Sequence, residues 1–155
     1  MGRLIGIVGP SGSGKSTSIG EVPVLGHKGL NPKETAIVNV MGKPFPFANK
    51  YTQRINNYNP VTQLYEKVQG GNLLISRNPV EIIQFMTEMM TLPNVKNILI
   101  DDFQYVMSNE IMKTAFVKRK EKFTKISANA YCILMTAINA RPDINVVILT
   151  HSEPV

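Results

Sequence analysis

Four short, largely apolar runs along the chain predict the strands of a β-sheet. They lie at residues 4–8, 35–40, 97–100 and 146–150. Apolar side chains stand mostly at consecutive positions in each run, which is typical of strands buried on both faces. The segments between the runs contain helical patterns, so the sequence predicts an α/β fold with a mostly parallel sheet covered on both sides.

A first helix is predicted between the second and third of these strands. Asn78 provides an N-cap and Pro79 suits the first helical position, and the helix should end before Pro93. We interpret the methionines at 86, 89 and 90 as core residues. The residues expected on the buried face are Val80, Ile83, Met86 and Met90.

A longer helix is predicted before the last strand, ending at Arg141 and Pro142. Its apolar residues recur every three or four positions, and we expect Cys132 to be a small buried residue among them. These positions are Phe123, Ile126, Ala130, Ile133, Ala137 and Ile138.

The middle of the chain is expected to be irregular over residues 41–60 because it holds three prolines and many amides. Residues 61–69 and 72–76 are predicted to pair as a hairpin across Gly70 and Gly71. We interpret His27, in a Gly/Lys-rich loop, as a surface residue.

The composition fits one globular domain. The chain has 155 residues, of which 43% are hydrophobic and 18% charged, enough to bury a core without disulfides. A single cysteine excludes a disulfide framework and a thiolate zinc site. The apolar runs are too short to cross a bilayer and no signal-peptide pattern is present, so we expect a cytoplasmic protein.

The first predicted strand leads into a glycine-rich loop that fits G-x-x-x-x-G-K-[ST] at every fixed position. In such a loop backbone N–H groups point at phosphate oxygens, Lys15 adds a charge near the β- and γ-phosphates, and the Ser16 hydroxyl can ligate Mg²⁺. A short helix starting near Lys15, stopped by Gly20 and Pro23, is expected to direct its positive end at the same anion. The predicted cofactor-binding residues are Gly9, Pro10, Ser11, Gly12, Ser13, Gly14, Lys15, Ser16 and Thr17.

Polar residues at the ends of two other strands complete the predicted chemistry. Asp101 closes the third strand and should hold Mg²⁺ together with Ser16, and Asp102 is the predicted general base. Thr150 and His151 leave the last strand where a polar group can contact the γ-phosphate, and histidine titrates near neutral pH. The predicted catalytic residues are Lys15, Asp102, Thr150 and His151.

Three classes of nucleotide-handling protein share this type of loop. A transporter-type ATPase would carry an LSGGQ-like signature, which the sequence lacks. A nucleotide kinase would need an arginine-rich lid, and the five arginines of this chain are not paired in one. The RecA-like and AAA group places an extra strand between the phosphate-loop strand and the acidic strand, and the Asp101–Asp102 pair and the last strand favour it.

Four further segments carry a more specific resemblance, at residues 39–47, 100–110, 122–126 and 149–153. With the phosphate loop, they resemble a bacteriophage family of ATP-binding P-loop proteins, similar to RecA-like phage proteins of single-strand annealing and recombination. The resemblance covers nearly the whole chain. It implies a RecA/AAA-like three-layer sandwich, ATP in the phosphate loop, and Mg²⁺ at Ser16 and Asp101. It also implies a sensor at Thr150 or His151.

Family members continue beyond the last strand, so we expect the chain to lack C-terminal strands of that fold. The formal net charge of +6 is concentrated in one segment between the acidic strand and the last strand. In RecA-like folds this interval faces DNA, so the resemblance suggests phosphate contacts with single-stranded DNA. The residues are Lys113, Lys118, Arg119, Lys120, Lys122 and Lys125.

The sequence therefore predicts an Mg²⁺-dependent ATPase that acts on single-stranded DNA in recombination or replication, as a homo-oligomer in the host cytoplasm. Two alternatives stay open. One is an ATP-binding switch with little turnover, because no clear catalytic glutamate is present. The other is a P-loop nucleotide kinase.

Overall fold

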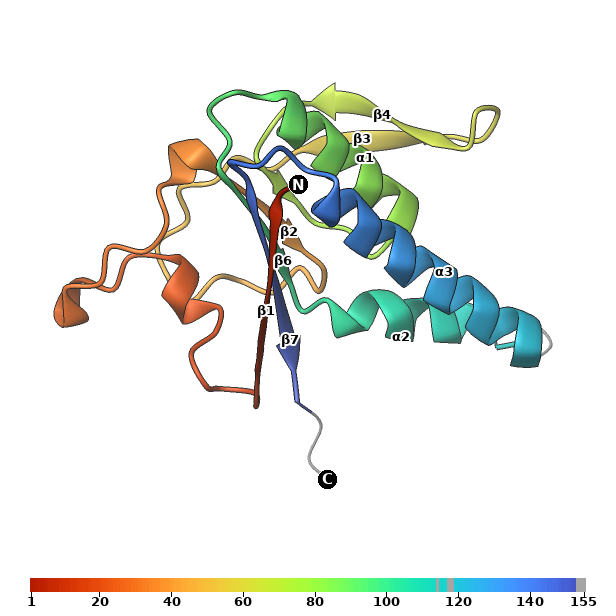
Figure 1. Ribbon diagram of the computed structural model, residues 1–155, viewed down its shortest axis with the longest axis horizontal. Coiled ribbons are helices and arrows are strands. Elements are labelled where there is room, and N and C mark those ends of the chain that lie inside the picture. Colours follow the sequence, from red (N-terminus) through yellow and green to blue (C-terminus); the bar gives the residue numbers. More distant parts are fainter. Residues whose placement is uncertain (114, 117–118, 153–155) are drawn as a thin grey trace.

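A five-stranded parallel sheet forms the centre of the protein (Figure 1). The computed structural model describes residues 1–113, 115–116 and 119–152. The strand order is β1-β7-β6-β2-β5, and every pairing in this sheet is parallel. The strands are β1 (Arg3–Gly9), β2 (Thr35–Asn39), β5 (Leu73–Leu74), β6 (Asn97–Asp101) and β7 (Asn145–His151). The predicted α/β class, the parallel sheet and its four main strands are confirmed.

Three α-helices pack against one face of this sheet. They are α1 (Pro79–Thr91), α2 (Gln104–Lys113) and α3 (Arg119–Ile138). As predicted, α1 begins at Asn78, whose side-chain oxygen accepts hydrogen bonds from the backbone N–H groups of Val80 and Glu81. Side chains from all three helices form one buried cluster with alternate residues of β2, β6 and β7. We call this the helical face.

The opposite face is covered by loops and 3₁₀ turns, and we call it the loop face. The turns are η1 (Thr17–Ile19), η2 (Pro23–Leu25) and η3 (Pro32–Glu34). Its buried cluster is small and consists of Ile19, Ile37, Tyr51, Leu73, Leu99 and Leu149. Among the described residues no α-helix lies on this face, so the three-layer sandwich with helices on both sides is only half present.

The helix expected from Lys15 is a single 3₁₀ turn, η1. Gly20 adopts an extended conformation directly after it, and Pro23 and two glycines with positive φ, Gly26 and Gly29, prevent the chain from resuming a helix. A single turn of three residues has almost no macrodipole. The prediction that the positive end of a helix contributes to anion binding is therefore wrong.

Strand β1 is not buried as the sequence predicted. It lies at the edge of the sheet with β7 as its neighbour, and Leu4, Ile7 and Val8 are 37%, 41% and 65% exposed. A run of apolar residues therefore identified the strand correctly but not its place in the sheet.

The predicted hairpin is wrong in the segments that it pairs, because residues 61–69 do not pair with residues 72–76. The hairpin joins β3 (Ile55–Asn59) to β4 (Leu64–Gln69), so part of the expected irregular segment is a strand. Its turn is set by the Asn59 side chain, which accepts hydrogen bonds from the N–H groups of Val61 and Thr62. Residues after Gly71 instead join the main sheet as β5.

Two expectations about helix faces also need correction. In α1 the fully buried residues are Pro79, Ile82, Phe85, Met86 and Met89, so the buried face is rotated away from Val80, which is exposed. In α3, Ile126, Ile133 and Ala137 are buried as expected, but Phe123 and Cys132 are exposed. The end of α3 that carries Phe123 extends past the sheet (Figure 1), which explains its exposure.

Candidate functional site

The carboxyl ends of the parallel strands meet at one edge of the sheet, the place where α/β proteins bind ligands. Gly9 is in register with His151, and Asn39 with Asp101. Side chains alternate between the two faces along a strand. Because Leu99 and Leu149 lie in the loop-face cluster, Asp101 and His151, two residues further on, point to that face as well.

The glycine-rich loop follows β1 at this edge. Gly12 and Gly14 have φ of +76° and +89°, a region that favours glycine. The Lys15 ammonium donates to the carbonyl oxygens of Gly9 at 2.7 Å and Pro10 at 2.8 Å. The Lys15 side chain therefore folds back over the loop. Its ammonium lies close to the backbone amides that such loops offer to phosphate.

The Ser16 hydroxyl donates a hydrogen bond of 2.8 Å to Asp101 Oδ2, joining the loop to the end of β6. Asp101 is buried, and this burial raises the pKa of its carboxyl. The hydrogen bond from Ser16 opposes the rise and the negative charge of Asp102 adds to it. A hydroxyl and a carboxylate side by side are oxygen donors that suit Mg²⁺.

These two residues do not form a metal centre by themselves. The described residues contain no group of three or more His, Cys, Asp or Glu side chains placed to hold a metal ion. Mg²⁺ commonly binds one or two carboxylates and fills its remaining positions with water and phosphate oxygens. Ser16 and Asp101 therefore fit a metal ion that arrives with a phosphate ligand.

Asp102 turns the chain sharply away from β6. Its φ is +61°, a left-handed conformation that costs energy for a residue with a side chain. One carboxylate oxygen lies 3.4 Å from Lys43 Nζ and the other 2.8 Å from His151 Nε2. Both oxygens of the predicted general base are thus engaged.

His151 connects this carboxylate to the phosphate loop. Its Nδ1 lies 3.4 Å from the Lys15 ammonium, which only donates hydrogen bonds. The hydrogen-bond pattern therefore assigns Nδ1 as the acceptor and Nε2 as the nitrogen that carries the proton donated to Asp102. Lys15, His151 and Asp102 form one chain of contacts.

Thr150 is not part of that chain. As the neighbour of His151 it points to the helical face, where its hydroxyl donates to Gln104 Oε1 at 2.9 Å. The backbone N–H of His151 approaches the same oxygen at 3.4 Å. Of the two sensor candidates, His151 therefore lies with the phosphate loop, and Thr150 contacts the first residue of α2.

The strand ends and the loop enclose a cavity of about 230 Å³. His151 and both aspartates line it beside the loop, whereas Thr150 does not. The predicted residues that line the cavity are Ser11, Gly12, Ser13, Gly14, Lys15, Ser16, Thr17, Asp101, Asp102 and His151.

Sequence reasoning missed two residues of this site, Lys43 and Gln104. Lys43 also lines the cavity, and its ammonium lies 5.5 Å from the centre of the Tyr105 ring. It follows Gly42, whose φ of +67° turns the chain back over the site. The sequence signal that could have identified Lys43 is its position directly after a glycine, just beyond a predicted strand.

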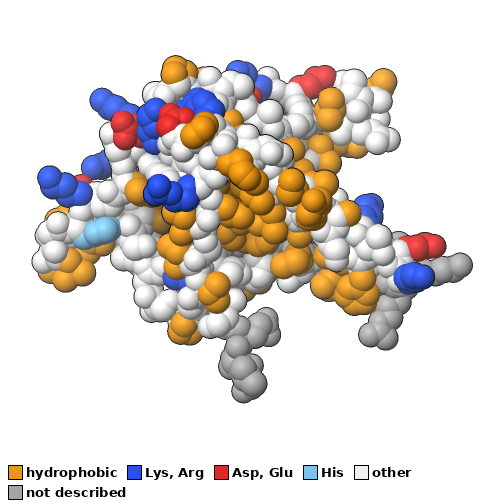
Figure 2. Space-filling view, in the orientation of Figure 1, with side chains coloured by type: hydrophobic (Ala, Val, Ile, Leu, Met, Phe, Trp, Pro, Cys, Tyr) orange, Lys and Arg blue, Asp and Glu red, His pale blue; other side chains and the backbone are white. Residues whose placement is uncertain are grey.

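The predicted nucleic-acid segment lies at the far ends of α2 and α3, which extend away from the sheet (Figure 1). Lys113, Lys120 and Lys125 are exposed and Lys122 is half-buried. Lys118 and the side chain of Arg119 lie outside what the structure describes. Figure 2 shows basic side chains with an acidic one at this end of the molecule.

Comparisons with protein-family models and with curated proteins find no match for this chain. Among the residues described, no helix has the length and apolar character needed to cross a membrane. The functional assignment therefore depends on the geometry of the site.

Proposed function

We propose that the chain binds ATP together with Mg²⁺ at the glycine-rich loop and hydrolyses it. The observation that carries this proposal is the 2.8 Å hydrogen bond between Ser16 and Asp101, residues 85 positions apart. It joins the two motifs that share a metal ion in proteins with this loop. The cavity around the pair is lined by glycines of the loop, two lysines and two carboxylates, which suits a magnesium-bound triphosphate.

The order of the strands supports a RecA/AAA-like P-loop fold as the finer classification. Strand β7 lies between β1, which leads into the loop, and β6, which ends in Asp101. An inserted strand at this position separates the RecA-like and AAA group from the nucleotide kinases. In addition, Arg54 is buried in an ion pair and Arg141 donates to three backbone carbonyls, so neither is available to a kinase lid.

In the proposed reaction a water oxygen forms a bond to the γ-phosphorus while the bond to the β–γ bridging oxygen breaks, giving ADP and phosphate. Lys15 and the loop amides stabilise charge on the β- and γ-phosphates. Ser16 and Asp101 would hold the metal ion, which would supply further positive charge beside the phosphates. Asp102 accepts the proton of the water, and His151 holds its carboxylate in place.

Nucleotide binding by purified variants tests the site. Lys15→Ala and Asp101→Asn should each weaken Mg²⁺-ATP binding at least about tenfold, since each removes a charged contact worth about 1.5–3 kcal/mol. Lys33→Ala, an exposed charge on η3, is the matched control and should bind like the parent. Unchanged affinity in the Lys15 variant would overturn the assignment.

A switch with little turnover is the second candidate, and one observation favours it. Both oxygens of Asp102 are already engaged by Lys43 and His151. To accept the proton of a water, one of these oxygens would first have to lose its present partner. Phosphate release by the parent and by Asp102→Asn separates the two, because only an ATPase loses a measurable rate in the variant.

We also propose that the ends of α2 and α3 contact the phosphates of single-stranded DNA. Phe116 is fully exposed beside the lysines of this segment, which adds a surface on which a base can stack. The first residue of α2, Gln104, contacts Thr150 and the His151 backbone, and α2 is about 15 Å long. This helix therefore connects the nucleotide site to the basic end.

Replacement of Lys120, Lys122 and Lys125 by alanine should weaken DNA binding and reduce its salt dependence by up to about two units of slope. The matched control replaces three exposed basic residues elsewhere, Arg3, Lys33 and Arg77. If both triple variants bind single-stranded DNA equally well, the basic segment is an ordinary solvated surface and this proposal is wrong. Measuring binding with and without ATP, and the subunit number in the same samples, tests the link to the nucleotide.

A further inference from the structure

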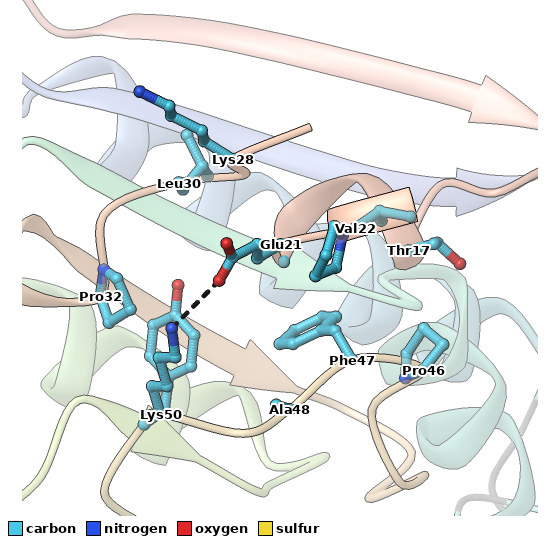
Figure 3. A pocket seen from close by; sticks show the side chains of 13 residues that line it. Thr17, Glu21, Val22, Lys28, Leu30, Pro32, Pro46, Phe47, Ala48 and Lys50 are labelled. Carbon is cyan, nitrogen blue, oxygen red and sulfur yellow. Dashed lines mark hydrogen bonds and ion pairs between the residues drawn. The ribbon is translucent and has the colours of Figure 1, made fainter. Parts of the chain in front are cut away.

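A second cavity, of about 340 Å³, adjoins the phosphate cavity on the loop face. Thr17 and Pro46 line both cavities. Figure 3 shows these two residues at one end of the space and Leu30 and Pro32 at the other. Its volume lies at the small end of the range for ligand pockets. A ligand held by the glycine-rich loop could thus extend past Thr17 into this space.

The walls of this second cavity are mostly apolar, with one polar side. Val22, Leu30 and Phe47 are among its lining residues. The polar side carries an ion pair of 3.3 Å between Glu21 and Lys50, drawn as a dashed line in Figure 3. An apolar pocket with a few polar groups that fix orientation is the usual form of a small-molecule site.

The Phe47 ring is held in a defined position. It stacks on Phe45 with 4.8 Å between ring centres and an angle of 12° between the planes. The ring also lies against the backbone of Gly20, where an added Cβ would overlap it. Only glycine at position 20 therefore leaves room for the Phe47 ring. A fixed aromatic ring gives the cavity an apolar wall that a ligand can contact without further loss of side-chain entropy.

Tyr51 also lines the cavity, and its hydroxyl is buried. Its hydroxyl lies near the Thr35 side chain but makes no hydrogen bond of good geometry to any group that the structure describes. Burial raises the pKa of this hydroxyl, so it stays protonated and can donate. Because this oxygen has almost no accessible surface, a ligand in the cavity would meet the rest of the Tyr51 side chain and not its hydroxyl.

We propose that this cavity binds the purine base of the nucleotide whose phosphates occupy the glycine-rich loop. The proposal rests on the proposed function, because the phosphate loop fixes where the nucleotide begins. The base packs against the apolar wall that includes Phe47, Glu21 accepts a hydrogen bond from the edge of the base, and Lys50 donates one. Thr17 lies at the junction of the two cavities, where the ribose would pass.

Comparison of ATP with tripolyphosphate, which has the phosphates but no base, tests the pocket separately from the loop. With Mg²⁺ present, ATP should bind at least about fivefold more tightly than tripolyphosphate, because the base buries apolar surface in the cavity. GTP should bind more tightly than CTP, because a purine buries more surface than a pyrimidine. Ala48→Phe places a ring in the cavity without removing a core side chain. It should abolish the advantage of ATP and leave tripolyphosphate binding unchanged.

A fluorescent variant gives a second measurement. The chain has no tryptophan, so Phe47→Trp introduces one reporter in the cavity wall. Its emission should change with ATP and not with tripolyphosphate. Tyr58→Trp, an exposed position on the β3–β4 hairpin, is the matched control and should respond to neither ligand.

The two proposals fail in different ways. If neither ATP nor tripolyphosphate binds, or if binding persists in Lys15→Ala, the proposed function and this pocket are both overturned. If both ligands bind with equal affinity and depend on Lys15, the phosphate site stands and the base pocket alone is overturned. A pyrimidine preference, or an unchanged ATP advantage in Ala48→Phe, also overturns it.

Discussion

The two faces of the sheet differ in how they are covered. The helical face carries a buried cluster of nineteen residues from three α-helices, the sheet and the segments that connect them. The loop face carries a cluster of six, under 3₁₀ turns and loops. Both cavities described above lie on the loop face. The larger apolar cluster stabilises the domain, and the less regular cover provides backbone groups and space for a ligand.

The strongest test of this comparison uses two adjacent residues of β6. Ile98 and Leu99 are isomers, are both buried and lie in the helical-face and loop-face clusters respectively. We expect Ile98→Ala to cost about 4 kcal/mol of unfolding free energy and Leu99→Ala about 2–3 kcal/mol, because loops collapse into a cavity more readily than packed helices. Urea unfolding measures both, and equal costs would remove the distinction.

The hairpin extends the comparison, since it packs on α1. Arg54 is buried and its guanidinium lies 2.6 Å from the Glu88 carboxylate. That hydrogen bond, with the positive charges of Arg54 and Lys67, lowers the pKa of Glu88. Glu88→Gln should cost about 1–2 kcal/mol, allowing for the partial exposure of Glu88.

The pH dependence of this variant follows from the direction of the shift. A lowered pKa means that the stabilisation is present above the ordinary value of 4.5 and is lost as the pH falls through the folded-state pKa. The difference between parent and Glu88→Gln should therefore disappear in acid. A constant difference across the titration would show that the ion pair is not its source.

At Asp101, on the loop face, we expect a smaller effect on the stability of the fold, with the opposite sign. Its raised pKa means that a favourable contribution exists below the ordinary value of 3.8 and is lost as the pH rises through the folded-state pKa. At neutral pH the ionised carboxylate therefore destabilises the ligand-free fold. Asp101→Asn should raise the thermal midpoint at neutral pH while it weakens Mg²⁺-ATP binding. A lower midpoint would contradict the assigned burial cost.

The smallest effect is expected at Asp143, near the start of β7. Hydrogen bonds from Lys96 and Arg141 lower the pKa of its carboxyl to about 2. The stabilisation is present above the ordinary value of 3.8 and is lost as the pH falls through about 2. Because the carboxylate is exposed, salt should screen the interaction. Asp143→Asn should match the parent in high salt, and a difference that salt leaves unchanged would contradict this.

Those parts of the fold and of the site that depend only on residues close together in the sequence could be predicted. The N-cap at Asn78, the consecutive apolar residues of β6 and the spacing of the glycine-rich loop each depend on neighbours in sequence. The exposure of β1 and the loop cover depend on which strand lies at the edge, and no local pattern encodes that. Lys43 joins the site through a turn at Gly42, while alternation along β7 already distinguishes His151 from Thr150.

The place of β1 in the sheet has a consequence for the order in which the protein assembles. Its neighbour in the described sheet is β7, so that Arg3 pairs with Asn145, a residue far along the chain. Pairings between such distant segments form slowly, and domains synthesised from the N-terminus must wait for them. The phosphate loop, although it directly follows β1, should therefore be among the last parts of the described fold to acquire its shape. Ligand binding would then report that synthesis has reached His151.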